Sequence, residues 1–123
     1  MLYTGAAVAE KERLVMIVKR EISADEVEIV PEGNLSRDDM NEFQKWLDEA
    51  LRGSHRTIVL NFEHLASLSS SAIGKILHFK KQCDETGRRL VIRKCSAEML
   101  QLLRMIKFDA LITIETERQD LQR

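Results

Sequence analysis

The stretch RTIVLNFEHLASLSSSAIGKIL, residues 56–77, joins an apolar run to a segment with helical periodicity. Its first seven residues (56–62) are the most strand-like run in the chain, and we expect them to form a central strand. A helix is predicted to begin near Ser70 and to end at Gly87. The spacing predicts an inward face made of Ala72, Ile73, Ile76, Leu77 and Cys83, and an outward face made of Ser71, Gly74, Lys75, His78 and Lys81.

Two further strands are predicted ahead of this stretch. RLVMIVKR (13–20) is an unbroken apolar run bounded by charge, which favours a strand buried on both faces. DEVEIVPEG (25–33) alternates apolar and acidic residues, as a half-exposed strand does. Val27 and Ile29 are expected to point inward and Glu26 and Glu28 outward, and a turn at Pro31 and Gly33 is expected to end the strand.

Helical patterns flank the remaining strands. Ser36 is a predicted N-cap for a helix with Trp46 at the edge of its apolar stripe and Gly53 at its end. That stripe consists of Met40, Phe43, Leu47, Ala50 and Leu51. RRLVIRKC (88–95) predicts a strand, Ser96 the cap of a helix, and ALITIETE (110–117) a last strand. The inward stripe of this last helix is predicted to be Met99, Leu102, Leu103 and Ile106.

The order of these elements predicts the fold class. Strands alternate with helices after an opening pair of strands, which is typical of an α/β domain. We expect a mixed, mostly parallel central sheet of about five strands with helices packed against it. No internal repeat or low-complexity segment suggests a second domain, so the 123 residues are read as one.

Composition limits the function classes. The chain has 19 basic and 20 acidic residues, a formal net charge of −1, which argues against nucleic acid or an acidic membrane as the main partner. No apolar run approaches the ~20 residues needed to span a bilayer. Cys83 and Cys95 form neither a disulfide framework nor a metal-ligand motif, which is typical of a reducing compartment. We therefore expect a cytoplasmic protein.

Signatures of catalysis are weak. His55, His64 and His78 are scattered without the short spacing of zinc ligands, and no G-x-S-x-G elbow or phosphate-cradling glycine loop occurs. We expect no enzymatic activity, no metal and no cofactor.

The serine run Ser69–Ser70–Ser71 stands out instead. One serine suffices to cap a helix, contributing about 1 kcal/mol. A helix amino terminus also favours added negative charge, and a phosphoryl group adds about −1.5 to −2 charges at neutral pH. We expect Ser69 or Ser70 to cap the helix, and Ser70 to be the phosphoacceptor, with Ser71 and then Ser69 as alternatives.

The chain resembles the STAS domain family, named for sulphate transporters and anti-sigma-factor antagonists. The resemblance rests on TIVLNFEHLASL, SSSAIGKIL, ETGRRLVIRKCS and AEMLQLLRMIKFDALITI, with EIVPEGNLSRDDMNEFQKWL upstream. It covers nearly the whole chain and implies one STAS-like domain over residues 1–123, with a core at about 14–117 and flexible ends. Its most specific parts are the serine loop and the FDALITI ending.

In the bacterial anti-sigma-factor antagonists of this family, the serine that follows an aspartate is phosphorylated by a kinase that is itself the anti-sigma factor. Unphosphorylated antagonist binds this kinase, phosphorylation releases it, and a phosphatase resets the system. By position, Ser70 fills the acceptor place and Gly74 the second glycine place. Ser69 stands where the family has aspartate, and Ala72 where it has the first glycine.

The resemblance thus implies a non-enzymatic regulator whose partners are an anti-sigma serine kinase and a serine phosphatase, with a homo-oligomer as a further candidate assembly. The expected partner-binding residues are Ser69, Ser71, Ala72, Gly74, Lys75 and His78. The alternative is a constitutive STAS scaffold in a signalling assembly, docking without phosphorylation. For Lys75 and His78, an ordinary solvated helix face explains the pattern equally well.

Overall fold

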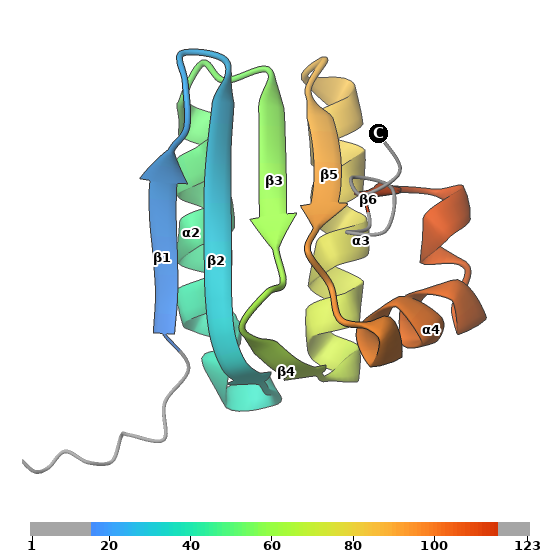
Figure 1. Cartoon of the computed structure of the whole chain (residues 1–123). Helices are drawn as coiled ribbons and strands as arrows, with labels where there is room; N and C mark the ends of the chain where they lie inside the picture. The colour runs from blue at the N-terminus through green and yellow to red at the C-terminus, as the bar shows by residue number, and fades with distance from the viewer. Residues whose placement is uncertain (1–15, 116–123) are drawn as a thin grey trace, which may run out of the picture.

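In the computed structural model, which describes residues 16–115, the central strand is β3 (Thr57–Asn61) (Figure 1). It lies between β2 (Glu26–Leu35) and β5 (Arg89–Arg93) and is parallel to both. β6 (Thr113–Glu115) extends the sheet beyond β5 in parallel, and β1 (Met16–Glu21) pairs antiparallel with β2. The predicted mixed, mostly parallel sheet and the central place of residues 56–62 are confirmed. The outermost residues of the predicted first and last strands, and the predicted flexible ends, lie outside the described residues.

A sixth strand, β4 (Leu65–Leu68), was not expected. It pairs in parallel with the last residues of β2 and leads directly into the serine run. Only Leu65 of its four residues is buried, while Ala66 and Ser67 are exposed. A strand this short carries no readable apolar period, so the sequence predicts no strand there.

The expected turn at Pro31 and Gly33 is wrong, because β2 continues through both residues. Pro31 lies where β2 has left β3 and has not yet met β4, a point at which the missing N–H breaks no parallel ladder. Gly33 has φ +87°, and the pairing register with β4 shifts just after it. Its N–H donates to the His64 carbonyl at 2.9 Å, which holds the two strands together across the irregularity.

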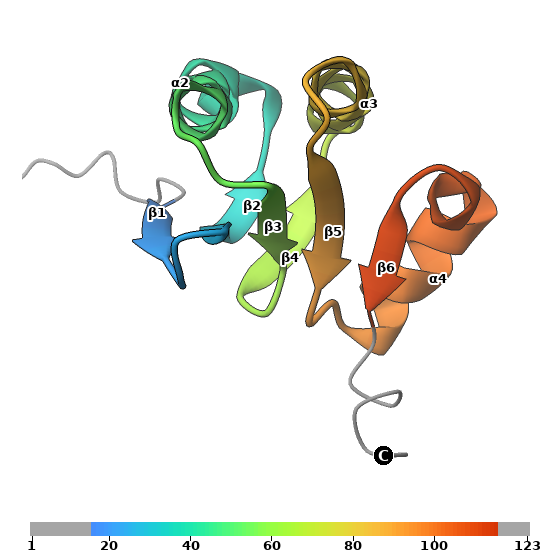
Figure 2. The ribbon, with the colours of Figure 1, turned by 90° about the horizontal axis from the view of Figure 1, so that it is seen from above.

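Two helices cover one face of the sheet (Figure 2). α2 (Met40–Arg52) follows a short 3-10 turn, η3 (Arg37–Asp39), and α3 (Ser70–Glu85) follows β4. The Asp39 carboxylate accepts hydrogen bonds from both the N–H and the hydroxyl of Ser36, at 2.8 Å each, which fixes the start of this region. Gly53 is the C-cap of α2, at the helix end that the sequence predicts.

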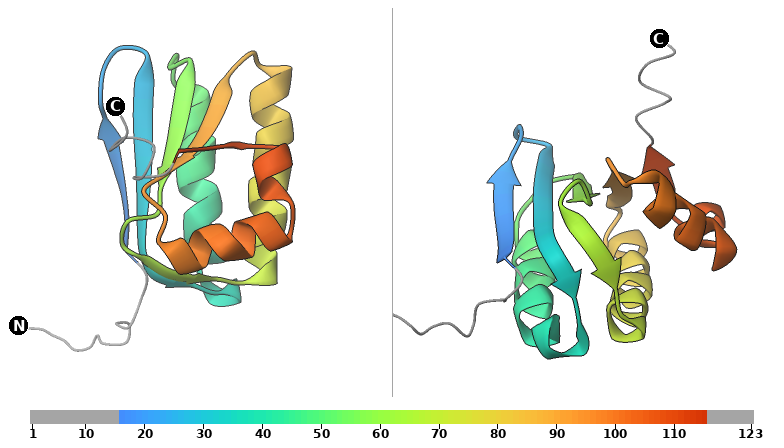
Figure 3. Two further views of the ribbon diagram at one scale, coloured as in Figure 1. Left: turned by 45° about the vertical axis from the view of Figure 1, so that its right-hand side comes forward. Right: turned by 60° about the horizontal axis from the view of Figure 1, so that its bottom comes forward.

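The third helix, α4 (Ala97–Met105), lies at the β5–β6 side of the sheet, away from α2 (Figure 3). The Ser96 hydroxyl accepts from the Met99 N–H at 3.0 Å, so the predicted cap is confirmed. A 3-10 turn, η4 (Phe108–Ala110), connects α4 to β6.

The core lies between the sheet and the helices. The observed burial differs from three of the sequence-based expectations. α3 buries Ala72, Ile76, Phe79 and Cys83, so the inward face passes through Phe79 and leaves Leu77 39% exposed. Ile106 follows the last residue of α4 and is 37% exposed rather than buried. β1 is the edge strand of the sheet. Val18 on β1 is 40% exposed, because none of the described elements covers the side of β1 that this residue faces.

The opposite face of the sheet carries paired charges. Glu28, expected to point outward to solvent, does face away from α2 and α3 but is only 5% exposed. Its carboxylate accepts from Arg20 at 2.7 and 3.1 Å and from the Asn61 amide at 2.8 Å. Arg93 donates to Glu26 at 2.9 Å and to Glu115 at 2.8 Å. A buried carboxylate with this many donors is satisfied where it stands and needs no ligand.

Candidate functional site

The serine turn, Ser69–Ser71, lies where β4 becomes α3. The Ser69 N–H donates to the Leu35 carbonyl at 3.0 Å, which ties the turn to the end of β2. The Ser69 hydroxyl accepts from the Ala72 N–H at 3.1 Å, and its carbonyl accepts from the Ile73 N–H at 3.0 Å. Ser69 is therefore the N-cap of α3, which confirms the expectation that Ser69 or Ser70 caps this helix.

Ser70 and Ser71 are the first two residues of α3, and both are exposed. Neither hydroxyl makes a hydrogen bond to another of the described residues. With the capping done by Ser69, these two hydroxyls are available to a partner or to a modifying enzyme.

Ala72 lies on the inward face of α3, as its spacing predicts, and this position conflicts with the expected contact between Ala72 and a partner. Its side chain is fully buried in the core, so it offers no surface to a partner, and the prediction that it contacts one is wrong. Position 72 is on the inward face of α3, four residues before Ile76. The methyl group that stands in the family's first glycine place therefore packs against the core instead of narrowing the approach of a partner.

Beyond the serine turn, the outward side of α3 is continuous. We call it the α3 stripe; it consists of Ser70, Ser71, Gly74, Leu77, His78 and Lys81, all exposed. Their spacing of three and four residues places them on one side of the helix. A Cβ added at Gly74 would meet nothing within 4 Å, so the stripe has open space one turn after the serines.

Lys75 is not part of the stripe. It is half-buried, and its Nζ donates to Oε1 of Gln44 on α2 at 2.8 Å, while the Gln44 amide nitrogen donates to Asp48 at 2.9 Å. Lys75 thus joins the two helices that cover the sheet. The sequence placed Lys75 on the outward face, and no sequence signal connects it to Gln44.

Hydrogen bonds to the end of β2 hold the serine turn in place. Ser67 donates from its hydroxyl to Asn34 Oδ1 at 2.8 Å, beside the hydrogen bond from Ser69 to Leu35. The 3-10 turn η3, with Asp38 and Asp39, lies next to the start of α3 (Figure 1). These supporting residues were missed by sequence reasoning, because only the unexpected β2–β4 pairing brings them to the site.

The fold and the position of the serine turn point to a known family. The sequence pattern described as "Mlab, STAS domain" matches residues 18–113, most of the chain. The chain belongs to this STAS-domain family. Comparison with curated protein sequences gives no significant match.

Several solved structures that resemble this STAS domain are those of anti-sigma-factor antagonists. SpoIIAA in its unphosphorylated form superposes with a TM-score of 0.69 at 19% identity, over 88% of this chain and 95% of that one. The phosphorylated form of SpoIIAA, a Bacillus cell-fate determinant, gives 0.65 at 20% identity, over 88% and 98%. A putative anti-sigma-factor antagonist of Thermotoga maritima gives 0.69 at 17% identity, over 86% and 92%. At these identities the likeness establishes the fold, and the predicted family and fold class are confirmed.

Cysteine chemistry is suppressed in the STAS domain. Burial raises the pKa of the Cys83 thiol to about 11, and burial also raises the pKa of Cys95. Both thiols are therefore protonated at neutral pH, where the thiolate is the reactive form. Within residues 16–115, His, Cys, Asp and Glu side chains nowhere gather in a group of three that could hold a metal ion. None of the helices in this part of the chain is both long and apolar enough to cross a bilayer.

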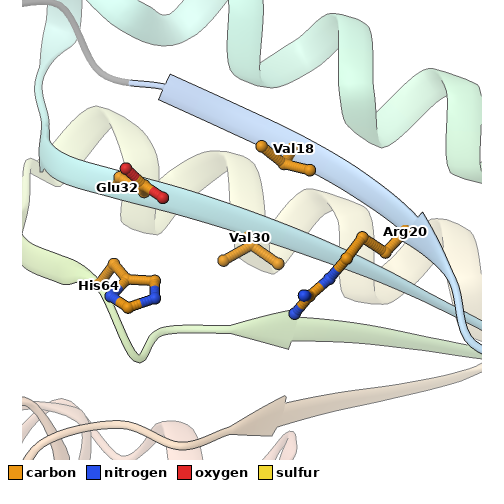
Figure 4. A pocket seen from close by; sticks show the side chains of 5 residues that line it. All are labelled: Val18, Arg20, Val30, Glu32 and His64. Atoms are coloured by element: carbon orange, nitrogen blue, oxygen red, sulfur yellow. The ribbon is translucent and has the colours of Figure 1, made fainter.

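A pocket lies on the sheet face opposite α2 and α3 (Figure 4). Val18 and Val30 line it with Arg20, Glu32 and His64. Arg20 already pairs with Glu28, and the remaining polar groups are one carboxylate and one imidazole, so the lining favours no one class of ligand.

Proposed function

We propose that this STAS domain is a non-enzymatic regulatory module that docks on an anti-sigma serine kinase and is released when Ser70 is phosphorylated. The observation that carries the proposal is that the serines of the turn have different roles. Ser69 caps α3, while the Ser70 hydroxyl is exposed and makes no hydrogen bond to another described residue. A site where modification leaves the helix cap intact suits a reversible switch. Its expected setting is the cytoplasm, where thiols such as Cys83 stay reduced.

The chemistry required of Ser70 is phosphoryl acceptance. Its Oγ attacks the γ-phosphorus of a nucleoside triphosphate bound to the kinase, and an O–P bond forms as the bond to the bridging oxygen breaks. The nucleoside diphosphate leaves with the bonding electrons, and the hydroxyl proton passes to a base of the kinase. The product adds about −1.5 to −2 charges at the positive end of the α3 dipole, where they are tolerated. A serine phosphatase restores the hydroxyl by hydrolysis.

Docking is assigned to the α3 stripe beside Ser70. Ser71, Gly74 and His78 are exposed on the same side of the helix, and the open space over Gly74 lets another backbone come close. Lys75 contributes to docking only by joining α3 to α2, because its ammonium group is already hydrogen-bonded to Gln44.

The test is mass spectrometry of the chain after incubation with its cognate kinase and a nucleoside triphosphate. We expect one phosphate on Ser70, none in the Ser70→Ala variant, and normal phosphorylation of Ser71→Ala. Ser70→Ala should still bind the kinase, whereas Ser70→Asp should bind more weakly. A chain that stays free of phosphate at all three serines would rule out the switch.

A second candidate is constitutive docking through the same stripe. It is favoured by Ser69, which has no carboxylate to help position a neighbouring hydroxyl and whose own hydroxyl is used by the helix cap. In that case the complex, measured by size-exclusion chromatography with light scattering, has the same stability for wild type and Ser70→Asp.

A further inference from the structure

The two helices that cover the sheet carry opposite net charge, although α3 has only one more lysine than it has acidic residues, which are Asp84 and Glu85 at its end. Between Glu63 and Asp84 the sequence contains no acidic residue, and this acid-free segment includes Lys75, Lys80 and Lys81. The segment from η3 through α2 instead has five acidic residues against three basic ones; the acidic ones are Asp38, Asp39, Glu42, Asp48 and Glu49. α2 and α3 lie side by side on one face of the sheet (Figure 2).

The positive charge on α3 is only partly compensated. Lys80 pairs with Asp84 at 2.6 Å, and Lys75 is bonded to the neutral amide of Gln44. Lys81, at the end of the α3 stripe, has no carboxylate within 4.0 Å among residues 16–115. An exposed and unpaired cation is a group that a partner carboxylate can neutralise.

An apolar side chain stands in the middle of the same stripe. Leu77 is 39% exposed, with Gly74 one turn before it and Lys81 one turn after it. The absence of a side chain at Gly74 lets a partner reach Leu77 without steric hindrance. The stripe therefore combines a neutral polar beginning, an apolar centre and one lysine at its end, which the exposed Glu85 follows one turn later.

We propose that the α3 stripe docks an acidic, amphipathic protein segment, with an apolar side chain over Leu77 and a carboxylate at Lys81. This inference rests on the proposed function, since it names the chemistry of the partner surface at the same site. An aliphatic contact supplies the buried area, and the carboxylate sets the orientation.

The geometry separates this recognition from the phosphate switch. Ser70 and Lys81 are eleven residues apart on one helix, a rise of ~16 Å along the axis. Charges at that spacing are screened at physiological salt, where the Debye length is ~8 Å. A charge at Ser70 and the loss of the charge at Lys81 therefore act on different parts of the partner, and their effects multiply.

The test uses two synthetic amphipathic helical peptides with identical leucine faces, one carrying glutamates on its polar face and the other lysines at the same places. Each is titrated into the isotopically labelled full chain, and amide shifts are followed by NMR. We expect the glutamate peptide to shift Gly74, Leu77, His78 and Lys81, and to bind more weakly as salt rises. We expect the lysine peptide to leave these residues unchanged.

Variants make the test specific. Lys81→Glu should weaken binding of the glutamate peptide by about two- to fivefold, while Lys45→Glu, the matched reversal at an exposed lysine of α2, should not. Ser70→Asp with Lys81→Glu should weaken binding by the product of the single effects. Equal shifts with both peptides, shifts confined to another face, or no shift with either would overturn the inference. Phosphorylation of Ser70 is measured separately by mass spectrometry. The docking inference can therefore fail while the phosphorylation proposal stands, and the reverse.

Discussion

The Nζ of Lys75 on α3 lies 2.8 Å from Oε1 of Gln44 on α2, and this hydrogen bond joins the two helices that cover the sheet. The hydrogen bond gives Lys75 a structural role, although its neighbours Gly74 and His78 on α3 are exposed. A long cationic side chain held in this way loses mobility and is less free to reach a second protein.

The first prediction concerns this bond. Lys75→Met keeps most of the apolar stem but removes the donor, so we expect the free energy of unfolding to fall by about 0.5–1.5 kcal/mol. Urea denaturation measures the change. Lys81→Met, at the exposed lysine of the α3 stripe, is the control and should change stability by less than about 0.5 kcal/mol. Equal losses in the two variants would contradict the role assigned to Lys75.

The second prediction separates the serines by stability. Ser69→Ala removes the acceptor of the Ala72 N–H and should cost about 1 kcal/mol of unfolding free energy. Ser70→Ala removes a hydroxyl that makes no bond within the described residues and should be nearly neutral. Thermal denaturation of both variants tests this; a larger loss for Ser70→Ala would mean that the cap is misassigned.

The third prediction is that a negative charge at Ser70 does not unfold the helix. Ser70→Asp places a carboxylate in the first turn of α3, which has no acidic residue of its own, so the dipole should stabilise it by about 0.3–1 kcal/mol. Ser70→Asn, which has the same shape without the charge, is the control. Denaturation curves at low salt provide the measurement. If Ser70→Asp is the less stable of the two, weakened partner binding by that variant can no longer be read as a surface effect.

The fourth prediction is that Gly74→Ala has opposite effects on stability and on docking. Gly74→Ala should stabilise the free chain by up to about 1 kcal/mol, because alanine is the better helix former and its methyl group meets nothing within 4 Å. The same methyl group should weaken partner or peptide binding to the α3 stripe. Melting temperature and NMR titration measure the two effects. Binding that is as tight as in wild type would show that the bare backbone at Gly74 is not needed for docking.

The fifth prediction follows from Cys83. Burial raises the pKa of its thiol from 9.0 to about 11, so the unfolded chain releases this proton at lower pH than the folded chain does. Below pH 9 both states hold the proton and the thiol contributes no pH dependence; between pH 9 and about 11 unfolding becomes easier as pH rises. We expect this fall in unfolding free energy to be smaller in Cys83→Ala, although that variant is less stable throughout. Parallel pH profiles for the two proteins would contradict the burial effect.

Sequence patterns were sufficient where one element decides the outcome by itself. The apolar run at 56–62 forms the central strand β3 because residues 58–61 are buried on both faces of the sheet. Ser96 caps α4 and Gly87, with φ +71°, follows the end of α3, since caps depend on a few neighbouring residues. The serine run was recognised as a helix start for the same local reason.

Tertiary structure alone decided how the serine turn is held and which residues lie at the edges of the faces of α3. The pairing of β4 with the end of β2 holds the serine turn in place, and a four-residue strand has no period that could predict it. The sheet fixes the rotation of α3, which exposes Leu77 and turns Lys75 toward Gln44. A shift of one residue along a helix rotates a side chain by about 100°, so a periodic pattern finds the helix but leaves the residues at the edges of its faces undecided. The chain's own pattern therefore determines where Ser70 lies along the fold, and packing between elements determines what surrounds it.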